Sequence, residues 1–240
     1  MTAGRKLNQY AGPLTPPQIA AGMNAALRNA RRLADDAKRL LDAERYPSAA
    51  CLAALAVEEA GKVSILRALA VARNDEDVRR SWKDYRTHTK KNVAWLLPDL
   101  AAKGARTLDD LRPLFEDGAE HPLILDQLKQ VGFYTDCLGR VHWSEPDQAI
   151  DADLARILVR TADVLARGRE VTVREIELWV EHVKPVWMGK LEWMKKALSN
   201  WRAAMQAEGL AVPDAGKFDN FIWGGAPGSP ATSDVPDDGV

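Results

Sequence analysis

The chain has 240 residues, of which 46% are hydrophobic and 28% charged, and its formal net charge is −1. This size and composition fit one domain with a substantial hydrophobic core. The near-zero net charge argues against a protein that coats nucleic acid or membrane through bulk charge, so any site for an anion would have to be local.

Cysteine usage and hydropathy exclude further classes of protein. Cys51 and Cys137 lack the spacing of metal ligands, which argues against a zinc site or a disulfide framework. The polar start, residues 1–10, has no apolar segment of a signal peptide. The longest apolar stretch, residues 49–57, is too short to span a bilayer. We therefore expect a cytoplasmic protein without a metal, a cofactor or a membrane segment.

The first half of the chain predicts three long helices, because alanine, leucine and arginine recur at helical spacing and no alternating β-branched run is present. The first helix begins after Thr15, an N-cap followed by two prolines, and ends before Tyr46. The second is expected over residues 47–73 and the third over residues 76–103. Pro98 should kink or end the third helix.

The second half predicts shorter elements and then two long helices. A helical turn is expected at residues 108–115, a short helix at 123–131 and a long helix at 146–168. Thr172 and Glu175 form the N-cap and N3 positions of a capping box. The helix that follows should run to about residue 207 with a bend at Pro185.

These elements predict an all-α fold, an antiparallel helical bundle with a disordered C-terminal tail. Residues 1–14 are an N-terminal extension, residues 15–210 the helical domain, and residues 211–240 a flexible tail rich in proline and glycine. Within that tail, the aromatic residues of segment 217–223 can dock back onto the bundle.

Glu59 is the least expected residue of the second helix. On a helical wheel it falls within the apolar arc that comprises Leu52, Leu55, Ala56, Val63, Leu66 and Ala70. Burial of an unpaired carboxylate costs several kcal/mol, so we predict that Glu59 is buried and paired with a cation from the third helix or from a second chain. The pair is either a structural salt bridge or part of a site. Glu58, in contrast, is expected to form a surface pair with Lys62.

The third helix concentrates cations around His88. Arg80, Asp84, His88 and Lys91 are expected to share one face of it. A solvated charged surface is the simpler interpretation. The alternative is a site for a phosphodiester, since lysine and arginine hold phosphate and histidine transfers protons near neutral pH.

Several segments together resemble a known family. They are Tyr46-Pro47-Ser48, Ala56-Val57-Glu58-Glu59-Ala60-Gly61-Lys62, Tyr85-Arg86-Thr87-His88-Thr89-Lys90-Lys91 and Gly132-Phe133-Tyr134-Thr135-Asp136, with Trp143 and Pro146. In this combination they resemble the AbiV family of abortive infection proteins, over about residues 15–207. The resemblance implies a HEPN-like helical bundle, a class that is often dimeric and includes many metal-independent endoribonucleases.

The usual HEPN motif is an arginine followed, four to six residues later, by a histidine, and this sequence departs from it. Seven residues separate Arg80 from His88, and one separates Arg86 from His88. Lys83 has the four-residue gap but is a lysine.

The resemblance implies an anti-phage protein, and its RNase hypothesis assigns roles to particular residues. His88 would be the general acid or base, Arg86 would stabilise the transition state, and Glu59 would orient one of them. The residues expected to bind RNA are Lys62, Lys83, Lys90 and Lys91. This chemistry needs no metal.

Two alternatives stay open: a binding protein that senses a phage component or blocks translation without catalysis, and a structural dimer whose charged surface is only solvated. A homodimer is expected because HEPN-like sites are often completed between subunits. The last helix also carries a surplus of tryptophan, at Trp179, Trp187, Trp193 and Trp201. The other expected partners are an RNA substrate and a phage protein that acts as trigger.

Overall fold

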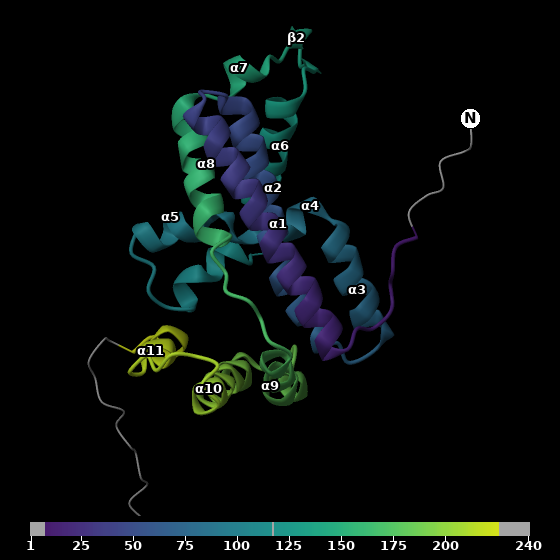
Figure 1. Cartoon of the computed structure of the whole chain (residues 1–240), viewed down its shortest axis with the longest axis vertical. Coiled ribbons are helices and arrows are strands. Elements are labelled where there is room, and N and C mark those ends of the chain that lie inside the picture. Colours follow the sequence, from purple (N-terminus) through teal and green to yellow (C-terminus); the bar gives the residue numbers. More distant parts are fainter. Residues whose placement is uncertain (1–7, 117, 226–240) are drawn as a thin grey trace, which may run out of the picture.

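The computed structural model describes residues 8–116 and 118–225. Helices make up most of this part of the chain, and its two strands are two residues long each (Figure 1). The predicted all-α class is confirmed. None of the described helices has the length and apolar character needed to cross a bilayer.

A bundle of four helices forms the larger part of the molecule. It consists of α1 (Pro16–Asp42), α2 (Tyr46–Ala70), α6 (His121–Phe133) and α8 (Ala152–Leu165). Helix α2 contacts the other three and therefore lies at the centre (Figure 1). The first helix begins as expected, with a capping box at Thr15.

Small side chains form the seam between α1 and α2. The buried alanines of this seam are Ala30, Ala34, Ala37, Ala49, Ala50, Ala53, Ala54 and Ala56. Alanine lets two helix axes approach closely, so the two longest helices form one rigid support. Larger residues of α6 and α8, including Leu125 and Leu158, complete this core.

The prediction of one continuous third helix is wrong. The segment is divided into α3 (Asp75–Arg86), α4 (His88–Lys91), the 3-10 helix η1 (Val93–Leu96) and α5 (Leu97–Ala102). The break is at Thr87, whose backbone is extended (φ −91°, ψ 124°).

The break changes which side chains share a surface. The Thr87 hydroxyl donates to the carbonyl of Lys83 at 2.8 Å, and α4 starts in a new direction. The expected common face of Arg80, Asp84, His88 and Lys91 therefore does not exist. Pro98 lies in the first turn of α5, where proline is tolerated, and kinks no long helix.

Short elements connect the bundle helices at its upper end in Figure 1. Strands β1 (Cys137–Leu138) and β2 (His142–Trp143) pair as an antiparallel hairpin, followed by α7 (Pro146–Ala149). The helix expected over residues 146–168 is thus two helices, because Asp151 caps α8 by accepting from the backbone N–H of Leu154 at 2.8 Å. The helical turn expected near residue 108 is the 3-10 helix η2 (Asp109–Leu114).

The C-terminal part forms a separate group of helices below the bundle in Figure 1. It contains α9 (Val173–Val183), the 3-10 helix η3 (Lys184–Val186), α10 (Leu191–Ala207) and α11 (Lys217–Trp223). The capping box at Thr172 and Glu175 is confirmed. The single helix to residue 207 is wrong, because the chain leaves helical geometry near Pro185 instead of bending.

Buried apolar residues of α9 and the side chain of Arg67 on α2 connect this group to the bundle. The guanidinium of Arg67 lies 5.4 Å from the ring of Trp179 and 5.3 Å from that of Trp201. In α11, the carbonyl of Phe221 accepts a hydrogen bond from the backbone N–H of Leu108. Segment 217–223 therefore docks as anticipated. Residues 226–240 of the predicted tail lie outside the described residues.

Gly61 allows α4 to lie directly against α2. A Cβ atom at this position would be 1.9 Å from the carbonyl oxygen of Lys91. The obstacle is backbone, which cannot rotate away as a side chain can. A glycine at this point of α2 is therefore a condition for the placement of α4.

We expect Gly61→Ala to lower the free energy of unfolding by roughly 1–3 kcal/mol or more, because α2 and α4 must separate to admit the methyl group. Urea denaturation measures this. Gly22→Ala is the matched control, since its nearest neighbour is a Leu66 methyl carbon at 3.4 Å. It should stabilise α1 by about 0.5–1 kcal/mol through helix propensity. Equal effects of the two substitutions would contradict the steric argument.

Candidate functional site

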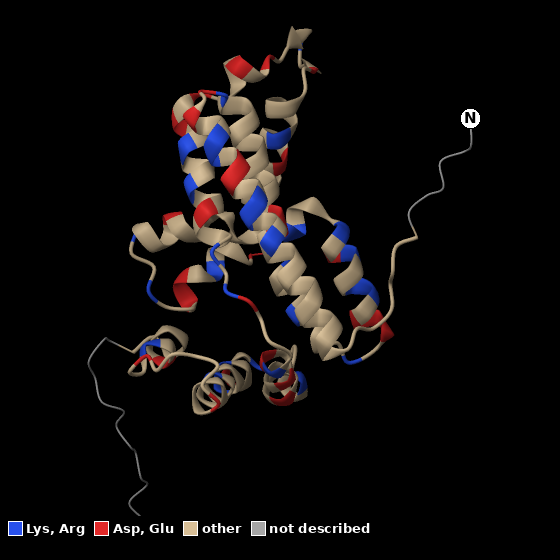
Figure 2. Cartoon of the chain, in the orientation of Figure 1, with Lys and Arg blue, Asp and Glu red and all other residues tan. Residues whose placement is uncertain are grey.

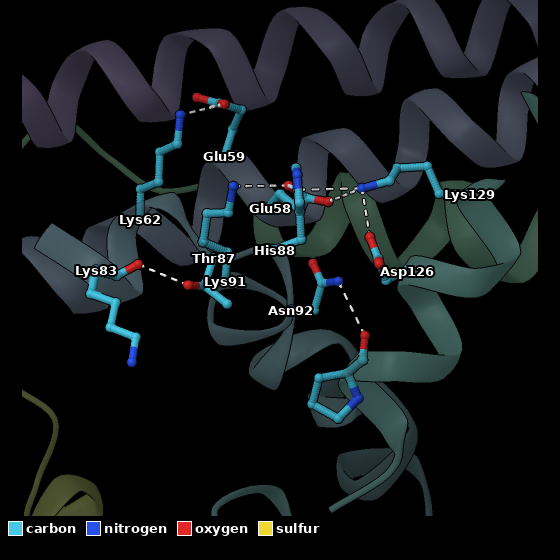
Figure 3. A network of polar contacts seen from close by, with 11 residues as sticks. Glu58, Glu59, Lys62, Lys83, Thr87, His88, Lys91, Asn92, Asp126 and Lys129 are labelled. Atoms are coloured by element: carbon cyan, nitrogen blue, oxygen red, sulfur yellow. Dashed lines mark hydrogen bonds and ion pairs between the residues drawn. The ribbon is translucent and has the colours of Figure 1, made fainter. Parts of the chain in front are cut away.

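A buried carboxylate, Glu58 of α2, is the centre of a polar network (Figure 3). Only 5% of its side chain is exposed. Its Oε1 lies 2.7 Å from Nζ of Lys129. Its Oε2 lies 2.7 Å from Nδ1 of His88 and 3.0 Å from Nζ of Lys91. Both oxygens are thus fully engaged.

Three elements hold the partners of Glu58. Helix α4 supplies His88 and Lys91, which are three residues apart and so lie on one side of a helical turn. Helix α6 supplies Lys129, whose ammonium also lies 2.9 Å from Asp126 in the preceding turn. The network therefore joins α2, α4 and α6 where these helices meet.

The charges in the network stabilise one another. Burial alone raises the pKa of Glu58, but hydrogen bonds from Lys129, His88 and Lys91 outweigh it and leave this pKa below its ordinary value. Burial lowers the pKa of Lys129, whereas Glu58 and Asp126 raise it, with a net increase. Glu58 is therefore a carboxylate and Lys129 an ammonium at neutral pH.

His88 is the exposed member of the network, with 55% of its side chain accessible. Nδ1 of His88 lies closer to the acceptor Oε2 of Glu58, at 2.7 Å, than to the donor Nζ of Lys129, at 3.4 Å, and the shorter contact favours a proton on Nδ1. In the neutral ring, Nε2 is then the unprotonated nitrogen and can accept a proton from a bound molecule. A buried carboxylate thus fixes both the tautomer and the orientation of an accessible histidine.

The prediction for Glu59 is wrong by one residue. Its carboxylate pairs with Lys62 of the same helix at 2.5 Å and is 20% exposed. The carboxylate that binds cations from other helices is Glu58, so the expected surface pair of Glu58 with Lys62 is wrong as well. The helical wheel misassigned Glu58 and Glu59 because it assumes one buried side. Helix α2 has other helices around it, and the side that carries Glu58 faces α4 and α6.

Arg86 does not meet His88. Its Nη2 donates to the carbonyl of Tyr10 at 2.6 Å, and its guanidinium lies 5.4 Å from the centre of the Trp82 ring. The structure therefore combines His88 with Glu58, and neither Arg86 nor Glu59 belongs to this network.

The four lysines expected to bind RNA fall into two groups. Lys62 and Lys91 are engaged by carboxylates. Lys83 and Lys90 are exposed, and neither forms an ion pair with another described residue. Elsewhere on the bundle, basic and acidic residues alternate (Figure 2), so local cations near His88 decide whether an anion is attracted.

Sequence reasoning missed Asp126, Lys129 and Asn92. Asn92 is wholly buried and donates from Nδ2 to the carbonyl of Pro122 at 3.3 Å, which holds α4 against α6. The available signal was a lysine and an aspartate three residues apart on a short helix with few other charges. It indicated the pair of Asp126 with Lys129. It did not indicate the contact of Lys129 with Glu58, because these two residues are 71 positions apart in the sequence.

Glu58, His88 and Asp126 also form a group with metal-ligand chemistry, since one donor atom of each lies within 4.8 Å of the others. The ammonium of Lys129 contacts both carboxylates of this group. A divalent cation would have to displace that ammonium. The donor set is therefore already neutralised by a side chain of the protein.

Glu58→Gln is expected to lower the free energy of unfolding by about 3 kcal/mol at pH 7, because it leaves two buried ammonium groups without their main partner. Glu59→Gln is the matched control and should cost about 1 kcal/mol or less, since its pair is partly exposed. Chemical denaturation of both variants checks the assignment. Equal losses would contradict it.

The same comparison has a defined pH dependence. A carboxylate whose pKa is lowered by folding stabilises the protein above its unfolded pKa of about 4.5, and this contribution disappears as pH falls through the folded value. The difference between wild type and Glu58→Gln should therefore be constant at neutral pH and shrink below about pH 4.5.

Comparison with known proteins gives one match. The family model HEPN_AbiV, described as AbiV, matches residues 18–167. This range is more than half of the chain, runs from α1 to the end of α8 and contains every residue of the Glu58 network. Neither curated proteins nor solved structures gave a match. The chain belongs to the AbiV family of HEPN-like proteins.

Proposed function

We propose that this AbiV-family protein is an abortive infection effector that cleaves RNA without a metal ion and so halts translation or growth of the infected cell. The family indicates the defence role. The cleavage rests on one observation: the exposed His88 is oriented by the buried carboxylate of Glu58. An oriented histidine with a free Nε2 is suited to proton transfer near neutral pH.

The reaction would begin at a ribose 2′-hydroxyl. Nε2 of His88 takes its proton while the oxygen attacks the adjacent phosphorus. The bond from phosphorus to the 5′ oxygen breaks, that oxygen takes a proton from water, and the His88 imidazolium later returns its proton to the solvent. The products carry a 2′,3′-cyclic phosphate and a 5′-hydroxyl. Glu58 stabilises the imidazolium formed in this step and is a positioning residue.

The phosphorane-like transition state carries an added negative charge that the site has to stabilise. Lys83 and Lys90 are exposed lysines on either side of His88 in the sequence. They would hold the phosphate and stabilise its added charge. Lys91 and Lys129 neutralise Glu58 and so keep the carboxylate from repelling the substrate.

A second candidate is a binding protein that senses a phage component or blocks translation without catalysis. The observation that favours it is the position of Arg86, which contacts Tyr10 and leaves His88 without an arginine. Both candidates place the protein in the cytoplasm, with RNA or a phage protein as partner.

If the protein is a metal-independent RNase, His88→Ala should reduce cleavage of single-stranded RNA by roughly 10²–10⁴-fold, the usual contribution of a general acid or base. EDTA should not change the rate, and the products should end in 2′,3′-cyclic phosphate. Gel electrophoresis and mass spectrometry of the products measure this.

His142→Ala is the control for that experiment, because His142 is another exposed histidine and lies on the hairpin. It should cleave as the wild type does. Suppose instead that His88→Ala still protects cells against phage and that neither the wild type nor either variant cuts RNA. The catalytic proposal then fails and the binding-protein candidate replaces it.

We further propose a homodimer. An apolar patch at the start of α10 supports it, since Met188, Leu191 and Trp193 are 60%, 47% and 59% exposed. Light scattering at micromolar concentration should give twice the chain mass of 26.5 kDa. Trp193→Arg should shift the protein towards the monomer, whereas a monomeric wild type would contradict the proposal.

A further inference from the structure

The N-terminal segment Asn8–Leu14 lies across α3 and is fastened there by its backbone. The carbonyl of Gly12 accepts a hydrogen bond from Nε1 of Trp82 at 2.8 Å. The carbonyl of Tyr10 accepts one from Nη2 of Arg86 at 2.6 Å. The ring of Tyr10 meets that of Trp82 edge-on, with 6.1 Å between the ring centres.

Most of these contacts converge on the end of α3. Arg86 is fixed from two sides, by the Tyr10 carbonyl and by the face of the Trp82 ring. The segment itself is kept compact, because the Tyr10 hydroxyl donates to the carbonyl of Pro13 at 2.9 Å. Yet Tyr10 remains 58% exposed. Leu14 anchors the end of the segment in an apolar cluster, whereas the part before it is held by few groups, which are open to competition from a ligand.

The backbone places Arg86 within reach of the candidate site. One residue, Thr87, separates Arg86 from His88, so their Cα atoms are at most about 7.6 Å apart. Only the extended Thr87 lies between them, and the long flexible side chain of an arginine has a reach comparable to that separation. A change of side-chain rotamer would therefore bring the guanidinium towards the exposed ring of His88.

We propose that the segment Asn8–Leu14 is an autoinhibitory latch that keeps Arg86 away from His88 in the resting protein. Release of the latch would free an arginine that can hold the phosphate of an RNA bound at His88. This inference rests on the proposed function, because it names the regulation of the same site. It also gives an abortive infection effector a resting state in which the phosphate-binding arginine is withheld.

The test uses the full-length protein and a fluorescein-labelled single-stranded RNA. Tyr10→Ala, alone and with Trp82→Phe, removes the ring contact and the Trp82 hydrogen bond. Hydrogen exchange should rise in residues 8–14, while thermal unfolding stays close to that of the wild type. RNA affinity and the single-turnover cleavage rate should each increase roughly tenfold, as expected when a hydrogen bond and a ring contact no longer oppose release.

Two further variants test whether the gain in RNA affinity and cleavage rate comes from the released Arg86. Gln9→Ala is the matched control, because Gln9 is an exposed neighbour in the same segment, and it should behave as the wild type. Arg86→Gln in the Tyr10→Ala protein should abolish the gain in affinity and in rate. The latch is overturned if the released variants bind RNA no better than the wild type, or if the gain persists without Arg86. Binding that increases through Arg86 while no variant cuts RNA would support the latch and reject the RNase.

Discussion

The arrangement of the candidate site depends on one buried negative charge. Glu58 lies on the central helix, and its two oxygens hold groups from α4 and α6. Removal of a carboxylate from water is unfavourable unless cations and hydrogen-bond donors replace the solvent. The lysines and the histidine therefore have to meet at this point of the fold. The contacts of α4 and α6 with α2 at this point, and the position of the exposed imidazole, meet that requirement.

The short helix α4 is the element that this requirement shapes most. Its close contact with α2 is possible because Gly61 presents no side chain to the carbonyl of Lys91. Asn92, which follows α4, ties it to the start of α6. A continuous helix through residue 87 could not satisfy these contacts together. The interruption at Thr87 thus separates a charged surface helix from a turn that faces the core.

Local features of the sequence predicted much of the fold. Capping residues located the starts of α1 and α9 correctly, and helical periodicity gave the class. The buried carboxylate was missed by one residue, because a wheel assumes one apolar side and α2 has neighbours around it. No proline or glycine lies at Thr87, so the local sequence did not predict the break in the helix there. Lys129 and Asp126 join the site only through tertiary contacts, which spacing along the chain does not encode.

Arg67 lies beside Trp179 and Trp201, whose ring centres are 5.2 Å apart, and this contact has a consequence for how the molecule opens. Helices α9 to α11 follow the part of the chain that matches the family, and Arg67 lies on α2, about two and a half helical turns from Glu58. Trp179 also clusters with Val71, which follows α2, and another apolar side chain of α9 is buried against α1. Helix α9 is therefore expected to unfold together with α1 and α2 and not as a unit of its own. A partner that captured the C-terminal helices would have to expose the apolar ends of α1 and α2 that they cover.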